Sequence, residues 1–350
     1  MGVPDAPPSP SASPHEGTSR TLSSSPARTL RHEASYSLLR DVIRVLTDDP
    51  RILLLADRLW DRATRGAATL RLVPAPVSLA IEVSATDPAA GVPLHLDERW
   101  RVDTDDAELS LGDQHLHARI ECGRGRFVAR VSAALVSDHP DLVTRLLLEA
   151  PAATLLARRS YAVVHAGAVA GPAGAVVIRG APGAGKSTVV AAAHQAGLRV
   201  LGDESMLVSR SDPDDLLSAV RDLTLLPAAA RLLGLEAMTT ATRSGGEEKR
   251  RVDLFSSSSP MTRRARRVAT VLLGPRNDGP ARLEPLTPET FLEEFRLGAI
   301  AQESWSGTPE HIAVHWSRRR AYRLSGAADL AGAIDLLTGL VAPLLAVKRA

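Results

Sequence analysis

The segment 175–188 constrains the fold of this chain more than any other stretch, because it joins a glycine-rich turn to a lysine, a serine and a threonine. The apolar residues 175–178 predict a buried strand before the turn, and the alanine-rich residues 189–196 predict a helix after it. The turn itself has the pattern G-x-x-x-x-G-K-S-T, and a strand before and a helix after are the context that a phosphate-binding loop requires. We therefore predict an α/β fold built around this loop.

The chemistry of phosphate binding explains the residue types in the loop. Glycines let backbone N–H groups approach phosphate oxygens, and the N-terminus of the following helix adds partial positive charge. Lys186 would contact the β- and γ-phosphates, and the Ser187 hydroxyl would bind Mg²⁺. A glycine-rich turn with an incidental lysine is the weaker alternative. The predicted cofactors are ATP and Mg²⁺, and the predicted nucleotide-binding residues are Gly180, Ala181, Pro182, Gly183, Ala184, Gly185, Lys186, Ser187 and Thr188.

Composition sets the class of the protein. The 350 residues are enough for two domains of roughly 100–200 residues each. The net charge of +2 does not by itself indicate nucleic acid as a partner, and the single cysteine excludes an intrachain disulfide. No apolar run reaches the ~18 residues of a membrane helix, and the N-terminus lacks a secretory pattern. We expect a soluble, cytoplasmic protein with no membrane partner, and a homo-oligomer is compatible with the sequence.

Changes in composition along the chain predict three regions. Residues 1–34 are rich in serine and proline and read as a disordered tail. Residues 35–140 predict a small α+β domain, and residues 141–350 a second domain with the loop. In the first we expect a helix over 36–46, or a strand over 42–46, and a helix over 51–64. We also expect strands over 68–73, 77–83, 99–102, 108–111, 115–121 and 126–131, and then a helix over 141–156.

The second domain is expected to alternate strands and helices around the loop. The apolar patterns predict strands over 160–169, 198–201, 206–209, 268–273, 312–316 and 321–324. They predict helices over 228–233, 290–297 and 326–345. Residues 239–251 read as a mobile loop. The basic runs 263–267 and 318–320 read as solvated segments, because no aromatic residues or nucleic-acid motif accompany them.

From His165 to Ser209 the sequence resembles the kinase domain of HPr kinase/phosphorylase and its shorter bacterial relatives. His-Ala-Gly-Ala-Val precedes the loop, and a strand running into Gly202-Asp203-Glu204 follows it. The resemblance continues more weakly through 248–253, 268–274 and 283–295 and covers roughly 150–330. It implies a P-loop kinase domain with the mixed sheet of the phosphoenolpyruvate carboxykinase-like fold, preceded by the small α+β domain.

The resemblance also implies roles for individual residues. Asp203 and Glu204 match a pair of aspartates, of which one accepts the proton of the substrate hydroxyl and the other supports the metal. His165 matches a histidine beside the phosphate site. The relatives have Ser-Glu after the lysine where this chain has Ser187-Thr188, which puts phosphorylase activity in doubt. Glu204 is one methylene longer than its counterpart, so the identity of the base stays open.

The residues support the same site without the family. Phosphoryl transfer needs a phosphate cradle, a metal held by oxygen ligands and a group that orients the nucleophile. Asp203 and Glu204 end a strand expected beside the loop strand, at the edge where open α/β sheets bind ligands. The predicted catalytic residues are Asp203, Glu204, His165 and Lys186. The predicted metal ligands are Ser187, Asp203 and Glu204. Lys249 and Arg250 are weaker candidates for a cation at the transferring phosphoryl group.

These observations predict an ATP-dependent kinase that transfers the γ-phosphoryl group to a hydroxyl. The acceptor is a serine of a peptide or small protein, or a small molecule, and the resemblance makes a role in peptide or natural-product tailoring plausible. The N-terminal domain would recognise the acceptor. The alternative is an ATP-binding and ATP-hydrolysing regulatory switch without a phosphorylated product. The sequence leaves open the acceptor and whether ATP, GTP or pyrophosphate is the donor.

Overall fold

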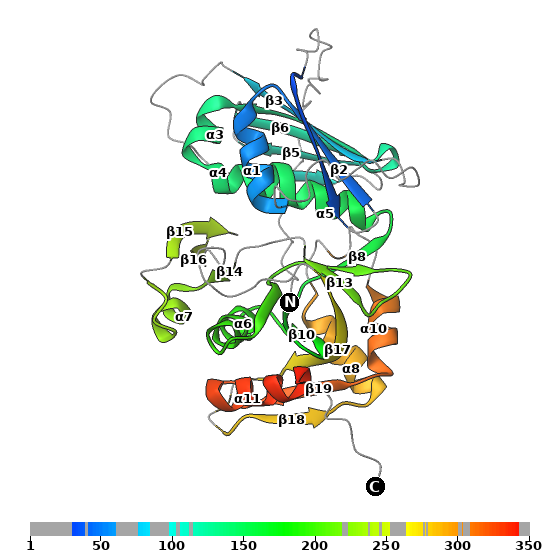
Figure 1. Cartoon of the computed structure of the whole chain (residues 1–350), viewed down its shortest axis with the longest axis vertical. Coiled ribbons are helices and arrows are strands. Elements are labelled where there is room, and N and C mark those ends of the chain that lie inside the picture. The colour runs from blue at the N-terminus through cyan, green and yellow to red at the C-terminus, as the bar shows by residue number, and fades with distance from the viewer. Residues whose placement is uncertain are drawn as a thin grey trace, which may run out of the picture.

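The protein is a mixed α/β protein with two large mixed sheets and one small sheet (Figure 1). The computed structural model describes residues 30–38, 41–60, 76–84, 98–102, 106–111, 115–218, 223–236, 239–244, 247–252, 264–275, 277, 279–299, 303 and 309–342. Residues 1–29 of the expected tail and the expected strand 68–73 lie outside these ranges. The last residues of the expected tail, from His32 on, begin the first strand.

The N-terminal sheet has seven strands within the described residues. Across the sheet they are β1 (His32–Leu38), β2 (Asp41–Thr47), β3 (Val77–Ser84), β7 (Arg126–Ser132), β6 (Leu116–Glu121), β5 (Asp106–Leu111) and β4 (Glu98–Val102). β3 pairs in parallel with β2 and β7, and the other pairs are antiparallel. The strands expected over 77–83, 99–102, 108–111, 115–121 and 126–131 are confirmed.

The helix expected over 36–46 is wrong, and the alternative, a strand over 42–46, is confirmed. β1 and β2 form an antiparallel pair in which His32 lies opposite Thr47 and Leu38 lies opposite Asp41. On β1 the buried residues Ala34 and Tyr36 alternate with more exposed neighbours. This period of two places every second side chain in the core, as a strand requires. The apolar spacing of 38–46 is compatible with either structure, and pairing with β3 decides it.

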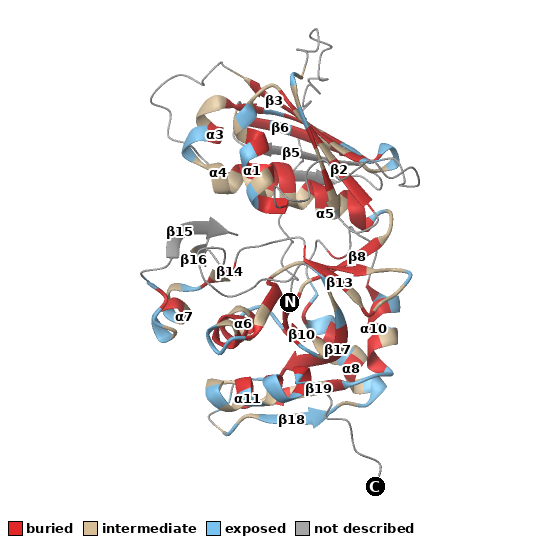
Figure 2. Cartoon of the chain, in the orientation of Figure 1, coloured by how far each residue is buried: buried red, intermediate tan, exposed pale blue. Residues whose placement is uncertain are grey.

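Helices cover one face of the N-terminal sheet. They are α1 (Pro50–Trp60), α3 (Ala133–Asp138), α4 (Pro140–Val143), a π-helical turn η3 (Thr144–Glu149) and α5 (Ala150–Ala157), and a short 3₁₀ turn, η2 (Cys122–Arg124), joins β6 to β7. The run 140–157 is helical as expected. Its leucines pack in the same core cluster as the N-terminal sheet, and that cluster continues into Val163, Leu207 and Leu217 of the second sheet. Buried positions lie on both large sheets and on the helices beside them (Figure 2).

The second sheet has nine strands within the described residues. Its main path is β11 (Arg199–Gly202), β9 (Gly167–Gly171), β10 (Gly174–Arg179), β17 (Arg264–Leu273), β13 (Asp215–Ser218), β12 (Met206–Ser209) and β8 (Tyr161–Val164). β19 (Ala321–Ser325) pairs in parallel with β17, and β18 (Arg282–Pro285) pairs with β19. The single strand expected over 160–169 is wrong, because the chain breaks at His165-Ala166 and its two halves lie far apart in the strand order.

The order of β11, β9 and β10 assembles the predicted site. β9 runs antiparallel to both neighbours, and Ala168 lies opposite Val177 on one side and Gly202 on the other. The ends of β10 and β11 and the beginning of β9 therefore meet at one edge of the sheet. β11 is separated from the loop strand β10 by β9, whereas the sequence suggested direct neighbours.

Helices pack on both faces of the second sheet. α6 (Lys186–Gln195) and α11 (Leu330–Val341) share one core cluster, and α8 (Pro288–Leu297) and α10 (Glu310–Ser317) share the other. The strand expected over 312–316 is wrong. The buried residues Ile312, Ala313 and Trp316 lie on one side of the helix α10. A short apolar run does not distinguish a buried strand from a buried helix segment.

A small third sheet contains β14 (Leu223–Leu225), β16 (Glu247–Val252) and β15 (Thr239–Ser244), with α7 (Pro227–Leu232) beside it. The loop expected over 239–251 is wrong for its described residues, because 239–244 and 247–252 form an antiparallel pair in which Thr239 lies opposite Val252. Arg251 on this hairpin makes an ion pair with Asp141 of α4. The hairpin is therefore tied to the helices of the N-terminal sheet.

The basic run 263–267 is expected to be solvated, and this holds for the Arg264 and Arg266 side chains, which are 59% and 62% exposed, but not for Arg267, which is buried. From Arg264 on, the run belongs to the strand β17. Arg264 pairs with Asp215 at 2.7 Å, and Arg266 pairs with Asp212 at 2.6 Å. Arg267 is buried and lies 2.8 Å from the Asp214 carboxylate. Each of the three arginines thus has an aspartate partner on the loop before β13 or at the start of β13. For the buried Arg267, this partner offsets the cost of burying a charge.

Candidate functional site

The glycine-rich loop joins β10 to α6 as the sequence predicts. Gly183 and Gly185 have φ angles of 78° and 97°, a region that residues with a side chain rarely adopt. Gly185 is the N-cap of α6, and residues 181–183 are exposed. The loop thus presents its backbone to solvent at the N-terminus of a helix, which is a favourable place for an anion.

Lys186 bends back over this loop. Its Nζ atom donates to the carbonyl oxygens of Gly180 at 2.9 Å and Ala181 at 3.3 Å, and its side chain is buried. Burial lowers the pKa of Lys186, and the charge of Asp203 opposes that shift. A buried ammonium beside an exposed loop is suited to a multiply charged anion.

Asp203 directly follows β11 and is buried, with 1% of its surface exposed. Neither carboxylate oxygen has a hydrogen-bond partner of standard geometry among the described residues. Burial and the charge of Glu204 raise the pKa of Asp203 to about 7, although the nearby Ser187 hydroxyl, the Glu204 backbone N–H and the Lys186 charge act to lower it. A Cβ at Gly167 would lie only 2.6 Å from Val190 Cγ2, so a side chain there would force Val190 to move, and it would also touch Asp203 Oδ1 at 3.4 Å.

Glu204 has a different environment from its neighbour. Its φ angle of 72° turns the chain immediately after the strand, which frees the two carboxylates from the alternation of a straight strand. Its Oε1 atom accepts from Thr224 Oγ1 at 2.7 Å and from Lys249 Nζ at 3.1 Å. Burial acts to raise the pKa of Glu204, but Thr224 and Lys249 together lower it below its usual value. Glu204 therefore stays ionised below pH 7, where Asp203 is largely protonated.

His165 lies between β8 and β9, beside Glu204. Its Nδ1 atom is 2.7 Å from the backbone carbonyl of Glu204. A carbonyl only accepts, so Nδ1 has the proton and Nε2 is left as an acceptor. Burial and the charge of Lys186 lower the pKa of His165. The ring is therefore neutral near pH 7.

The structure brings together the predicted residues His165, Lys186, Ser187, Asp203 and Glu204. It adds Lys249 from β16, one of the two weaker candidates. Arg250, the other, lies on the same strand and is paired in register with Leu225 and Ala241. The described part of the chain contains no group of three or more His, Cys, Asp or Glu side chains placed to hold a metal ion. Such a cluster is not needed for Mg²⁺, which proteins often hold through one or two carboxylates plus substrate phosphates.

Sequence reasoning missed three residues of the site: Thr224, Arg179 and Glu303. Arg179 ends the strand β10 and is 1% exposed, and it forms a buried ion pair with Glu303. An arginine at the end of an otherwise apolar strand, directly before the loop, was a usable signal. Thr224 and Glu303 have no local pattern around them, so only the folded arrangement reveals their positions.

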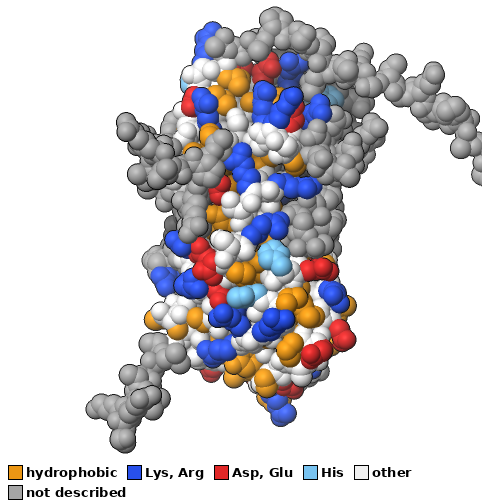
Figure 3. Space-filling view, turned by 90° about the vertical axis from the view of Figure 1, so that its right-hand side faces the viewer, with side chains coloured by type: hydrophobic (Ala, Val, Ile, Leu, Met, Phe, Trp, Pro, Cys, Tyr) orange, Lys and Arg blue, Asp and Glu red, His pale blue; other side chains and the backbone are white. Residues whose placement is uncertain are grey.

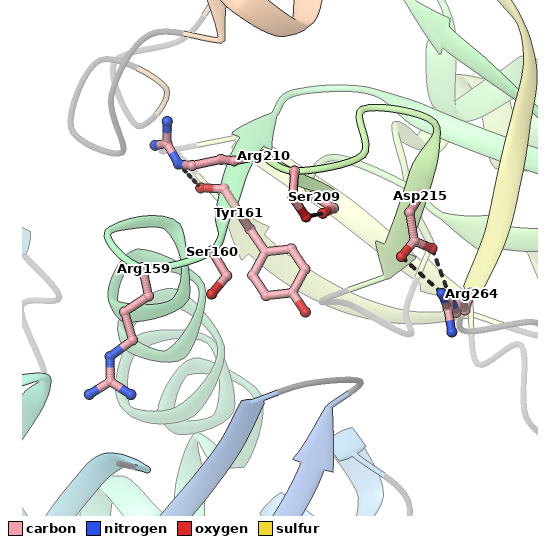
Figure 4. A pocket seen from close by; sticks show the side chains of 8 residues that line it. Arg159, Ser160, Tyr161, Ser209, Arg210, Asp215 and Arg264 are labelled. Atoms are coloured by element: carbon pink, nitrogen blue, oxygen red, sulfur yellow. Dashed lines mark hydrogen bonds and ion pairs between the residues drawn. The ribbon is translucent and has the colours of Figure 1, made fainter. Parts of the chain in front are cut away.

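A pocket of about 350 Å³ lies at the opposite edge of the second sheet (Figure 4). It is lined by Arg159, Ser160, Tyr161, Ser209, Arg210, Ser211, Asp215 and Arg264. In Figure 4 the guanidinium groups of Arg159 and Arg210 point in different directions, and Arg264 is held by Asp215. None of the predicted site residues lines this pocket. On the face shown in Figure 3, Lys and Arg side chains are scattered, with Asp and Glu side chains between them.

Comparison of the chain with protein-family models and with curated proteins finds no match. Among the described residues, no helix is both long enough and apolar enough to cross a membrane. The geometry of the site and the sequence motif are therefore the grounds for a functional assignment.

Proposed function

We propose that the protein is an ATP-dependent kinase that transfers the γ-phosphoryl group to a hydroxyl, in the manner of HPr kinase. The observation with most weight is the Asp203 carboxylate, which is buried and lacks a hydrogen-bond partner among the described residues. Such a group is costly in a fold unless it is protonated or meets a cation. The mixed second sheet around the loop supports a fold similar to that of phosphoenolpyruvate carboxykinase.

The exposed loop and Lys186 are suited to the phosphates of ATP. The backbone of 180–185 lies at the N-terminus of α6, and Lys186 is buried next to it. In the protein alone the Lys186 ammonium donates to two carbonyls of its own loop. We expect phosphate oxygens to compete for these donor positions, since charge-assisted hydrogen bonds are roughly twice as strong as neutral ones.

Ser187, Asp203 and Glu204 would hold Mg²⁺. One buried oxygen of Asp203 fits this ion as a ligand, and the other stays available to the acceptor hydroxyl, since neither oxygen has a partner among the described residues. Bound Mg²⁺ would neutralise charge on the phosphates during transfer. The Ser187 hydroxyl lies at the start of α6, close enough to Asp203 to lower its pKa.

The different environments of the two carboxylates suggest different roles. The pKa of Asp203 is about 7, close to that of an effective general base at neutral pH, so Asp203 would accept the proton of the acceptor hydroxyl. Glu204 stays ionised through Thr224 and Lys249 and would support the metal. Neutral His165 would orient the hydroxyl through Nε2, and Lys249 would stabilise charge on the transferring group.

The acceptor is a serine of a peptide or small protein, or a small molecule, and the N-terminal sheet would recognise it. The ion pair between Arg251 and Asp141 supports this division, because it ties the hairpin beside the site to the helices of the N-terminal sheet. A role in peptide or natural-product tailoring stays part of the proposal. The hydrolysing switch is the alternative outcome of the test.

The test is incubation of the full chain with [γ-³²P]ATP, Mg²⁺ and candidate acceptors encoded by neighbouring genes. We expect label on an acceptor with the wild-type protein and at least ~100-fold less with Asp203→Asn, as for loss of a general base. Asp215→Asn, at the opposite edge of the sheet, is the matched control. If free phosphate is released at the same rate whether or not an acceptor is present, the result would instead support the ATP-hydrolysing regulatory switch.

A further inference from the structure

A buried ion pair between Arg179 and Glu303 contacts the backbone of His165. The Arg179 guanidinium donates to Glu303 through Nη1 at 2.5 Å and through Nη2 at 3.0 Å. The two side chains are 1% and 3% exposed. Arg179 is the last residue of β10, and Glu303 belongs to the chain after α8, so 124 positions separate them.

Both members of this pair bind the backbone of His165. The His165 N–H donates to Glu303 Oε1 at 2.5 Å, and Arg179 Nη1 donates to the His165 carbonyl at 3.1 Å. The ring Nδ1 donates to the Glu204 carbonyl at 2.7 Å. Three of the four polar atoms of His165 are thus held within the described residues, and Nε2 is the one left for a ligand.

The pair is itself held in place by α8. Arg179 Nε donates to the Phe295 carbonyl at 2.8 Å, and its guanidinium carbon lies 3.9 Å from the centre of the Phe295 ring. A Cβ at Gly298 would come within 3.0 Å of Arg179, so the chain passes tightly over the arginine. These contacts leave the guanidinium one orientation.

We infer that Arg179 and Glu303 are positioning residues that fix the backbone of His165 and aim its Nε2 atom at the phosphoryl-transfer site. This inference deepens the proposed function and rests on it. A buried ion pair is a weak source of stability, because desolvation of both charges offsets their attraction. Its contacts instead restrict one residue at the edge where the loop, Asp203 and Glu204 meet, and a small displacement of a catalytic group is costly to the rate.

The same sheet contains a matched control pair. Arg267 on β17 is buried, lies 2.8 Å from Asp214 and has its guanidinium carbon 5.4 Å from the centre of the Trp316 ring. Both pairs therefore join a strand arginine, an acid and an aromatic ring of a neighbouring helix. The Asp214 carboxylate binds Arg267, His315 and Arg319 and none of the predicted site residues.

The experiment compares full-length wild type, Glu303→Gln and Asp214→Asn, with two readouts. Nitrogen NMR of ¹⁵N-histidine-labelled protein, with the His165 signals assigned from His165→Asn, reports the tautomer of the ring. We expect the Nδ1–H form in wild type and Asp214→Asn, and a mixture of both forms in Glu303→Gln. The second readout separates ATP affinity from turnover: kcat for transfer should fall about tenfold or more in Glu303→Gln, with the ATP dissociation constant changed less than about threefold.

An unchanged tautomer in a folded Glu303→Gln protein would overturn the inference, and so would an equal loss of turnover in Asp214→Asn. If Glu303→Gln does not fold, two measurements on the wild-type protein test the inference instead: amide exchange at His165 and the tautomer of its ring. A slowly exchanging His165 amide and a pure Nδ1–H ring would support the inference, and rapid exchange or the Nε2–H form would overturn it. The NMR readout does not need kinase activity. A chain that transfers no phosphate but shows the expected tautomers therefore contradicts the proposed function and not the positioning of His165.

Discussion

Asp203 and Glu204 are adjacent in sequence, yet their surroundings move their pKa values in opposite directions. Asp203 is buried without a hydrogen-bond partner among the described residues, whereas Glu204 accepts from Thr224 and Lys249. Two neighbouring carboxylates with separated pKa values are a frequent arrangement in active sites that need one acid–base group and one permanent charge. The sequence could not assign these roles, because burial and the partner residues come from distant segments.

The raised pKa of Asp203 predicts a pH dependence of transfer. As a general base Asp203 must be ionised, and kcat/KM for MgATP reports the ionisation of the free enzyme, in which the pKa of Asp203 is about 7. We therefore expect kcat/KM to rise with pH through about 7 and level off above it. We expect this limb in the pH profile of wild type and of the control Asp215→Asn. A profile that is flat between pH 6 and 8 would show that Asp203 is not the titrating base.

The same pKa predicts an effect on stability of the opposite sign. The folded protein binds the Asp203 proton more tightly than the unfolded chain does, so the ionised carboxylate costs folding free energy as pH rises from about 4 to 7, and the cost stays above 7. The free energy of unfolding of Asp203→Asn, measured relative to wild type, should therefore be more favourable at pH 8 than at pH 5, by an amount on the order of 2–4 kcal/mol. Urea unfolding at both pH values measures this difference, and an equal effect at both would contradict it.

At the scale of elements, the hairpin β15–β16 brings a cation to the site. Lys249 lies 3.1 Å from Glu204, and both side chains are partly exposed. Lys249→Ala removes one of the groups that lower the pKa of Glu204, so that pKa should rise. Transfer should slow by about tenfold or more, while stability changes by less than about 1 kcal/mol. Steady-state kinetics and urea unfolding check this, with Arg44→Ala, which breaks an exposed ion pair on the N-terminal sheet, as control.

The elements also show what the sequence could predict. The loop unit 175–196 and the acidic pair were predictable, because a strand, a spaced motif and a helix cap are all local signals. The hairpin over 239–252 and the helix α10 were not. Thr239–Ser244 gains its structure by pairing with β16, and Ile312–Trp316 by packing against Phe295. These partner residues are distant in sequence, so the secondary-structure propensity of the local residues is a weak guide to the structure they adopt.

Two buried charged residues were also not predictable from the sequence. Arg267, away from the site, reads as solvated in sequence, since nothing adjacent to it shows that Asp214 will lie beside it. Glu303 shows no pattern at all, yet it is buried and accepts hydrogen bonds from Arg179 and from the His165 backbone. Residues that act by contacts across more than a hundred positions are found only when the topology is known.

For the whole molecule, the core clusters decide whether the two large sheets unfold together. The cluster of the N-terminal sheet includes Leu147 and continues to Val163, Leu207 and Leu217 of the second sheet. A continuous apolar core and the ion pair from Arg251 to Asp141 both oppose independent opening of either part. We therefore expect a single cooperative unfolding transition.

Two of the four tryptophans report on the two parts separately. Trp60 is buried in the N-terminal core and Trp316 in the core of the second sheet. In variants that keep one of them and have Phe at the other three positions, urea unfolding followed by fluorescence should give the same midpoint. Leu217→Ala should lower both midpoints together, at a cost of about 2–5 kcal/mol for a buried leucine. If only the Trp316 midpoint falls, the N-terminal sheet is stable by itself, and the shared cluster does not couple acceptor recognition to the site.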